Sequence, residues 1–279
     1  MAQNKIACQQ YSWFTYLQRE DKVWNADLDA FFELVKQSGY AYFEGAFDSL
    51  EDATNMSKAI TKSEVSGRSL YVNSTLHIQE EIEQSIQSVL VQAKVVKKWG
   101  VEIIVTNPRP IEWGKPYDKS DEELVLQANA LDRLGLELRK IGMQLAYHTH
   151  DTEMRQSARE FHHMLWNTDS ENVKLCLDSQ WIHLGSGLSN VALFDIVKMY
   201  MDRIVELHIR QSKDGIWTET FHEGEIDYPR LVETLLSAGK RPNLVMEQAV
   251  QEGTPNTISA VEAMRQNLEN TLQIFKPLL

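Results

Sequence analysis

The sequence predicts an α/β protein of the (β/α)8 TIM barrel class, formed as a single domain over residues 1–279. Three observations predict this fold class. Eight strand-like and eight helix-like segments alternate along the chain. The length is close to the roughly 250 residues that such a barrel uses. Four strand-like segments of the second half end in a metal-binding side chain, as expected where barrel strand ends meet at one mouth.

The strand-like segments are short apolar runs rich in Val, Leu and Ile, which is typical of parallel strands that are buried on both faces. The first, KIACQQYSW, opens the barrel, and the second, YAYFEGA, contains Glu44 near its end. In chain order the eight segments cover residues 5–13, 40–46, 68–74, 101–105, 145–150, 174–181, 205–210 and 244–248.

The segments between these strands carry apolar residues at helical spacing. In the first of them, Leu28, Phe31, Phe32 and Val35 share one face, and Gly39 provides the stop signal. The eight helical segments are 27–39, 50–61, 78–100, 121–142, 159–167, 190–203, 228–239 and 260–275. No Ser/Gly/Pro linker separates them, so a single domain is expected.

The segment 106–118, TNPRPIEWGKPYD, is rich in Pro and Gly and is predicted to be a loop over the barrel mouth. An open doubly wound sheet would give similar alternation. Neither G-x-G-x-x-G after the first strand nor G-x-x-x-x-G-K-[ST] occurs anywhere, so the usual phosphate-binding signals of that fold are missing. The barrel is therefore favoured.

The composition restricts the classes of partner that the protein is expected to bind. With 40 acidic and 28 basic residues the formal charge is −12, which disfavours nucleic acids and anionic membrane surfaces. The chain shows no signal-peptide pattern at its start and no membrane-length apolar run, so a cytoplasmic location is expected. Cys8 and Cys176 lie within apparent buried strands, where cysteine acts as a small hydrophobic residue. No apolar face announces an interface, and association into a homo-oligomer stays open.

The candidate metal ligands are His148, His150, Asp178, His208 and Glu247. From His148 the strand-end positions are separated by 30, 30 and 39 residues, the length of a strand-plus-helix unit. His148 and His150 are two residues apart and can point to the same side, so either could bind the ion. Nitrogen and oxygen ligands without thiolates favour manganese, iron, cobalt or zinc over magnesium.

Each of these residues also has a structural interpretation, as a helix cap, a core histidine or a surface ion pair. Four successive strand ends together favour a metal site. The other histidines are weaker candidates: His162 and His163 fall in a helix, and His77 and His222 in loops. His183 is expected in a loop that could face the mouth.

Several stretches resemble the xylose-isomerase-like TIM-barrel superfamily. They are GMQLAYHTHDTEM, KLCLDSQWIHLGSG, IVELHIRQSKDG with FHEGEIDYPRLVETLLSAG, and NLVMEQ. The openings KIACQQYSWF and GYAYFEGAF are also similar to the first two strands of that family. Its members include sugar and sugar-phosphate isomerases and epimerases, inosose dehydratases, and endonucleases that cut at abasic sites.

The resemblance implies one divalent metal at the ends of strands five to eight. Its ligands would be His148, Asp178, His208 and Glu247. The resemblance further implies that Trp181 contacts substrate and that Arg210 is the family's basic residue after strand seven. Together with Glu44 and Asn107 near the mouth, these form the predicted substrate-binding set.

One departure bears on the mechanism. Many epimerases of the family have a glutamate at the end of strand five, facing the strand-eight glutamate, and here that position is His148. Glu247 and His148 are therefore the expected proton-transfer residues, since a histidine can act as an acid or a base near neutral pH. The YHxH pattern instead resembles the inosose-dehydratase branch.

The leading hypothesis is a metal-dependent isomerase or epimerase of a keto-sugar or polyol. It would remove a proton next to a carbonyl and form a metal-stabilised enediolate. The alternatives are a dehydratase of an inosose or 3-keto-sugar and a non-catalytic sugar-binding protein; a repair nuclease is disfavoured by the acidic charge. A neutral substrate is favoured, because the basic residues near the mouth form only a modest cluster. The polar and stacking groups considered are Asn107, Trp113, Trp181 and His183, and the basic cluster is Arg109, Arg210 and Lys213.

Overall fold

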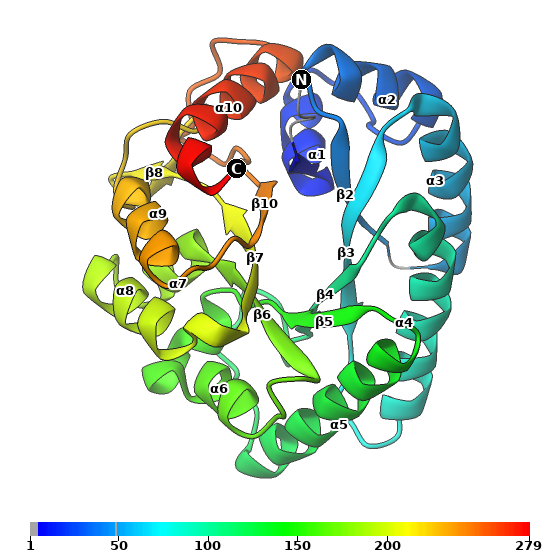
Figure 1. Cartoon of the computed structure of the whole chain (residues 1–279), viewed down its shortest axis with the longest axis vertical. Coiled ribbons are helices and arrows are strands. Elements are labelled where there is room, and N and C mark those ends of the chain that lie inside the picture. Colours follow the sequence, from blue (N-terminus) through cyan, green and yellow to red (C-terminus); the bar gives the residue numbers. More distant parts are fainter. Residues whose placement is uncertain (1–4, 48) are drawn as a thin grey trace.

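A computed structural model describes residues 5–47 and 49–279 of the chain. Eight parallel strands close into a barrel in the order β1-β10-β7-β6-β5-β4-β3-β2, and the helices surround it (Figure 1). The predicted TIM barrel is thereby confirmed. The barrel strands are β1 Ile6–Gln9, β2 Tyr42–Ala46, β3 Ser66–Ser74, β4 Ile103–Pro108, β5 Gln144–Tyr147, β6 Val173–Asp178, β7 Ile204–Ile209 and β10 Asn243–Met246.

The helices follow the strands in chain order, and several begin at a side-chain cap. The Ser120 hydroxyl, for example, accepts the Glu123 N–H while the Glu123 carboxylate accepts the Ser120 N–H, which forms a capping box. The α-helices are α1 Gln10–Arg19, α2 Leu28–Gln37, α3 Leu50–Ser63, α4 Ile82–Val96, α5 Asp121–Lys140, α6 Arg155–Trp166, α7 Ser179–Gly185, α8 Asn190–Met199, α9 Tyr228–Ser237 and α10 Ala260–Phe275. Short 3-10 turns cover Lys97–Trp99, Thr152–Met154, Met201–Arg203 and Lys276–Leu278.

The first strand is shorter than predicted. It ends at Gln9, and α1 begins at the next residue, because the Gln9 side chain accepts the Tyr11 N–H and caps the helix. Trp13, Tyr16 and Leu17 then recur at helical spacing and are buried. The expectation of a strand over 5–13 was therefore wrong in its second half.

The sixth strand ends at Asp178, the strand-end position predicted for it. The Asp178 Oδ1 accepts the Trp181 N–H at 2.8 Å, which caps α7. His183, which was expected in a loop, is buried within α7. A small hairpin that the sequence did not reveal, β8 Ser212–Lys213 with β9 Ile216–Trp217, follows β7.

Buried apolar side chains fill the layer between the barrel and its helices. Close packing is visible at Gly135 on α5, where an added Cβ would lie 2.1 Å from the Asn172 carbonyl oxygen. Within the described residues, no helix combines the length and the apolar character that crossing a bilayer requires.

Gly135→Ala is expected to lower the free energy of unfolding by about 1–3 kcal/mol, because α5 must move away from the Asn172 backbone. Denaturant titration would measure this. The control is Asn129→Ala, an exposed position on the same helix, which is expected to change stability by less than about 0.5 kcal/mol. Equal stability of the two variants would contradict the close packing.

Candidate metal centre

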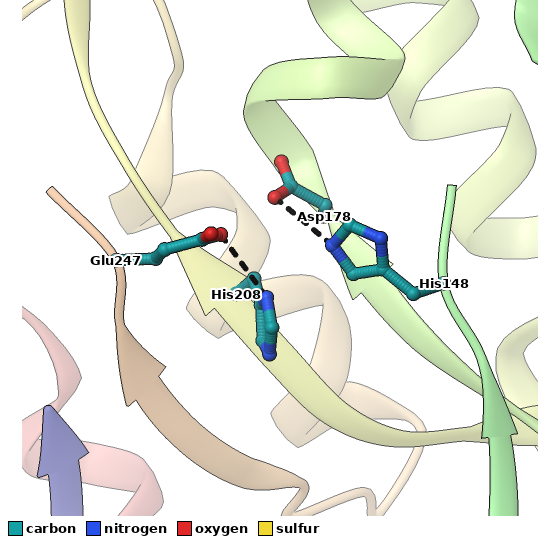
Figure 2. A group of neighbouring side chains, drawn as sticks. All are labelled: His148, Asp178, His208 and Glu247. Atoms are coloured by element: carbon teal, nitrogen blue, oxygen red, sulfur yellow. Dashed lines mark hydrogen bonds and ion pairs between the residues drawn. The ribbon is translucent and has the colours of Figure 1, made fainter. Parts of the chain in front are cut away.

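Four of the predicted ligands converge at the carboxyl ends of adjacent strands. His148 follows β5, Asp178 ends β6, His208 lies in β7 and Glu247 follows β10. One ligand atom from each lies within 4.8 Å of the ligand atoms of the others, and all four side chains are buried. Figure 2 shows them pointing into one shared space.

Backbone hydrogen bonds fix the directions in which these side chains point. The sheet ladder continues past two of the strand ends, because the His148 N–H donates to Thr106 O at 2.9 Å and the Glu247 N–H donates to Ile209 O at 3.0 Å. Side chains alternate along a strand, so a residue two positions earlier shares the inward face. Cys176 before Asp178 is such a residue.

The contacts inside the group leave ligand atoms available. His148 Nε2 lies 3.4 Å from Asp178 Oδ2, and neither atom has a hydrogen-bond partner. His208 Nδ1 lies 3.1 Å from Glu247 Oε2. Buried polar atoms without partners are costly. A divalent cation among imidazole nitrogens and carboxylate oxygens would satisfy them, so the donor set fits a metal ion.

Burial sets the protonation of the group. It lowers the pKa of His148 to about 3, with a further contribution from the nearby His208. Burial also raises the pKa of Asp178 to about 7, and the negative charge of Glu247 adds to this. Burial acts in the same direction on Glu247, but Arg210 and His208 outweigh it and hold the pKa of that carboxyl well below its usual range. His148 is thus neutral at pH 7, as a metal ligand must be.

Glu44 supports His208 from inside the barrel. Its Oε2 lies 3.2 Å from His208 Nε2 and accepts a hydrogen bond from the Ser69 hydroxyl. Glu206 Oε1 lies 3.8 Å from the same nitrogen. Burial, and next the charge of Glu44, raise the pKa of Glu206 to about 8. Burial lowers the pKa of His208, but Cys176, Glu44 and Glu247 outweigh it and hold that pKa well above its usual value. A metal ion would therefore displace the proton from Nδ1, which faces Glu247, while Nε2–H stays directed to Glu44.

Two of the predicted substrate-binding residues, Glu44 and Asn107, lie outside the lining of the cavity at the barrel mouth. Glu44 is fully buried beneath the ligand cluster, and Asn107 is buried with its Nδ2 donating to His148 O at 3.1 Å. Their contacts favour a supporting role, because Glu44 contacts His208 and Asn107 bonds to the His148 backbone.

A cavity of about 640 Å³ lies over the cluster, and of the four ligands only Glu247 lines it. Its walls are strongly aromatic. The aromatic lining residues are Tyr11, Tyr71, Trp113, Trp181 and Trp217. Tyr11, Tyr71 and Trp217 were not among the predicted site residues, because only the folded barrel brings those segments to the mouth.

His150 lies in this cavity and outside the ligand group. Its ring centroid is 5.0 Å from that of Trp113 and 5.2 Å from that of Trp181. Its Nδ1 is buried and has no hydrogen-bond partner. The geometry therefore selects His148 as the ligand candidate and leaves His150 facing the cavity.

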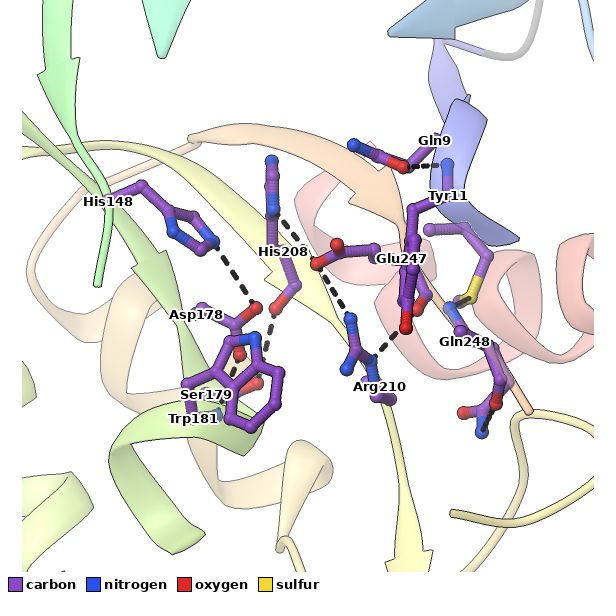
Figure 3. Close-up of polar contacts among 12 residues, drawn as sticks. Gln9, Tyr11, His148, Asp178, Ser179, Trp181, His208, Arg210, Glu247 and Gln248 are labelled. Atoms are coloured by element: carbon purple, nitrogen blue, oxygen red, sulfur yellow. Dashed lines mark hydrogen bonds and ion pairs between the residues drawn. The ribbon is translucent and has the colours of Figure 1, made fainter. Parts of the chain in front are cut away.

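Arg210 links the cluster to the cavity wall. Its Nε donates to Glu247 O at 2.9 Å, and Nη2 lies 3.1 Å from Glu247 Oε2 (Figure 3). The guanidinium carbon lies 4.1 Å from the Trp217 ring centroid and 5.3 Å from that of Trp181. Nη1 and Nη2 are buried and make no hydrogen bond. They can donate to an oxygen atom of a bound molecule.

The remaining histidines lie elsewhere. His162 and His163 are on α6, where His162 Nδ1 lies 2.7 Å from the Tyr200 hydroxyl. His77, His183 and His222 do not line the cavity over the cluster.

Comparison with known proteins gives a family and several distant relatives. The model of a family described as xylose isomerase-like TIM barrel matches residues 32–270. An inosose dehydratase of Lacticaseibacillus casei is 26% identical over 174 residues, which are 56% of this chain and 57% of the relative. The chain thus spans a little over half the length of the curated relative that it matches.

Solved structures share the whole fold. A D-allulose 3-epimerase from Methylomonas sp., in complex with D-allulose, has a TM-score of 0.75 and 14% identity over 97% of both chains. The IOLI protein with a binding zinc atom has a TM-score of 0.70 and 17% identity over 99% of both chains. At these identities the likeness shows the fold alone.

Proposed function

Because this chain belongs to the xylose isomerase-like TIM barrel family, we propose that it is a metal-dependent enzyme acting on a keto-sugar or keto-polyol. It removes a proton from the carbon next to the carbonyl group. The observation that carries the proposal is the buried His/Asp/His/Glu cluster whose glutamate, Glu247, reaches an aromatic-walled cavity. Enzymes among its relatives and structural neighbours, dehydratases and epimerases of sugars and inososes, support the substrate class.

His148, Asp178, His208 and Glu247 would hold the ion. When bound, it would polarise the substrate carbonyl and stabilise the negative charge that develops as the adjacent proton leaves. Nitrogen and oxygen ligands suit manganese, iron, cobalt or zinc, and the zinc of the IOLI protein, a structural neighbour, is consistent with this set.

Glu247 is the proposed base. The positive charge of Arg210 keeps its carboxylate ionised, and its side chain lies at the boundary between cluster and cavity. Arg210 would donate from Nη1 or Nη2 to a substrate oxygen. The aromatic walls would exclude water, which strengthens these electrostatic interactions.

His150 is the proposed second proton-transfer group, in place of His148, which was first expected in that role, because His150 lines the cavity and His148 does not. His150 follows β5, which two strands, β6 and β7, separate from β10 and Glu247. The two residues therefore approach bound substrate from different sides. Return of a proton to the same carbon from the other side would epimerise it, and return to a neighbouring atom would isomerise the sugar.

A dehydratase is the second candidate, and the inosose dehydratase that the chain matches in sequence favours it. In this reaction Glu247 again takes the proton next to the carbonyl. Burial, and next the neighbouring His148, lower the pKa of His150 to about 3, so its ring must take up a proton as substrate binds. It then protonates the hydroxyl group on the next carbon, which leaves as water while a carbon–carbon double bond forms. Both reactions share the first step.

The cavity suits an unphosphorylated substrate. Arg155 lines it but already donates to Asp118 Oδ1, Lys115 O and Tyr117 O, at 2.7, 3.1 and 2.8 Å. Arg210 is paired with Glu247. Lys115, an exposed lysine, is the third basic residue of the lining, so a phosphate would meet one lysine and the free N–H groups of Arg210 and no larger basic cluster.

The test is metal analysis followed by incubation of the metal-loaded protein with keto-sugars and inososes in deuterated water. One ion per chain, with deuterium incorporated next to the carbonyl, is the expected result. Loss of water in the product would identify the dehydratase. A metal-free protein that exchanges no proton with any member of the panel would overturn the proposal.

Glu44→Gln is expected to weaken binding of the metal ion about 10–100-fold, because the amide no longer fixes the His208 ring as a carboxylate does. Isothermal titration of metal into the stripped protein would measure this. Glu102→Gln, an exposed glutamate, is the control and should bind metal as the parent does. Unchanged affinity in Glu44→Gln would remove the supporting role of that residue.

A further inference from the structure

The cavity over the cluster does not end at the barrel mouth. A second cavity of about 660 Å³ adjoins it, and Tyr11 and Trp217 line both. Each volume lies in the range of about 300–1,000 Å³ that small-molecule sites occupy. We refer to these two neighbouring cavities together as the groove: Glu247 lines the inner one, and Phe14 and Gln18 of α1 line the outer one.

Aromatic rings follow this groove. Tyr11 and Phe14 are 40% and 41% exposed, which is unusual for large aromatic side chains so close together. Their ring centroids are 6.2 Å apart at an interplanar angle of 29°, so they present one broad surface. Further in, the Trp217 centroid lies 5.8 Å from that of Trp181. Tyr11 lines the inner cavity with Glu247 and Arg210 (Figure 3).

The polar groups of the outer cavity are neutral or already engaged. Arg19 donates to Pro255 O, Gln251 O and Thr254 O at 2.7, 2.8 and 3.1 Å, so its guanidinium holds the neighbouring loop. Gln18 and Asn256 supply amide groups, and Glu252 is the acidic residue. Among these lining residues Arg19 is the one basic side chain, and its Nη1 and Nη2 groups are already engaged by carbonyl oxygens, whereas a neutral hydroxylated ring would find amide donors and acceptors.

We propose that the outer cavity, lined by Tyr11, Phe14, Gln18, Trp217 and Asn256, is a second sugar subsite. The substrate is then a keto-glycoside of at least two rings. The ring that bears the carbonyl lies over the metal cluster, and the second, neutral ring stacks on Tyr11 and Phe14. The apolar faces of sugar rings pack against aromatic side chains, while amides bond to their hydroxyl groups. This inference rests on the proposed function for the placement of the first ring.

The test measures ligand binding to a variant that does not turn over substrate, so its outcome does not depend on the test of the reaction. Metal-loaded Glu247→Gln protein is titrated with glucose and methyl glucoside, and then with cellobiose, maltose and lactose. At least one disaccharide is expected to bind about tenfold more tightly than either single-ring probe. In the double variant that adds Phe14→Ala, this advantage is lost while single-ring affinity is unchanged.

Trp166→Ala, which removes an exposed aromatic residue on α6, is the matched control and should retain the advantage. Equal affinities for one and two rings, or no binding by any disaccharide, would overturn the subsite. A second copy of the chain is the alternative occupant of the outer cavity, and size-exclusion chromatography tests for it. If Phe14→Ala converts a dimer into a monomer, a second copy of the chain covers this face and the sugar subsite is wrong. Failure of deuterium exchange alone would overturn the proposed reaction and leave these binding results standing.

Discussion

Glu247→Gln is expected to slow proton exchange on the substrate by about 10²–10⁴-fold, the contribution typical of a positioned general base. An amide cannot accept the proton from carbon at neutral pH. The side chain keeps its size, and the amide oxygen can still accept a hydrogen bond from Arg210. The measurement is the rate of deuterium incorporation by metal-loaded protein, with the circular dichroism spectrum as the check on folding.

The design of this experiment separates chemistry from binding. Glu252→Gln, in the loop beyond β10, is the matched carboxylate-to-amide control and should exchange at the parent rate with a single-ring substrate. Metal content must be measured in each protein, because Glu247 is also a proposed ligand. Parent-like exchange in metal-loaded Glu247→Gln would show that another group takes the proton.

Removing the metal ion is expected to lower the free energy of unfolding. Adding the ion back should restore that stability, and the recovery should require His148 as a ligand. A ligand at about 100 times its dissociation constant adds about 2.7 kcal/mol to the free energy of unfolding. Adding Mn²⁺ or Zn²⁺ to stripped parent protein should therefore raise its melting temperature by several degrees. In His148→Ala this increment should largely disappear, since the ion loses one of four ligands.

His150→Ala is the matched control for this prediction. It removes a partly buried imidazole from the same segment, but one that lines the cavity. The metal-induced increment should survive in it, while proton exchange falls. The increment is compared within each variant, so any stability lost through the substitution itself cancels. The opposite pattern, with the increment lost only in His150→Ala, would exchange the roles of the two histidines.

The positions of the strands followed from local sequence. Short apolar runs separated by helical spacing predicted eight strands, and all eight form the barrel. The boundary error in the first strand has a local cause, because the polar cap Gln9 ends that strand early. Gln9 and Asp178 each begin a helix directly, and the apolar residues that follow them, such as Trp13 and Ile182, belong to α1 and α7.

From the sequence, the candidate site could be predicted as a set of strand-end positions and no further. Parallel strands of a closed barrel end at one rim. A barrel fold therefore places Asp178, His208 and Glu247 close to one another. The same argument could not choose between His148 and His150. Alternation puts both on one side of an ideal strand, but β5 ends at Tyr147, and beyond it the chain direction depends on its neighbours.

By itself, then, the sequence determined the order of the elements and which residue types stand at the strand ends, since both depend on local apolar periodicity. Only the tertiary structure decided how deep each side chain lies in the barrel and which side chains contact one another. Glu44 lies beneath His208 and not at the mouth, and Glu206 joins it inside the barrel. The physical reason is that closing the sheet sets the height of each strand relative to the next, and no single segment encodes that height.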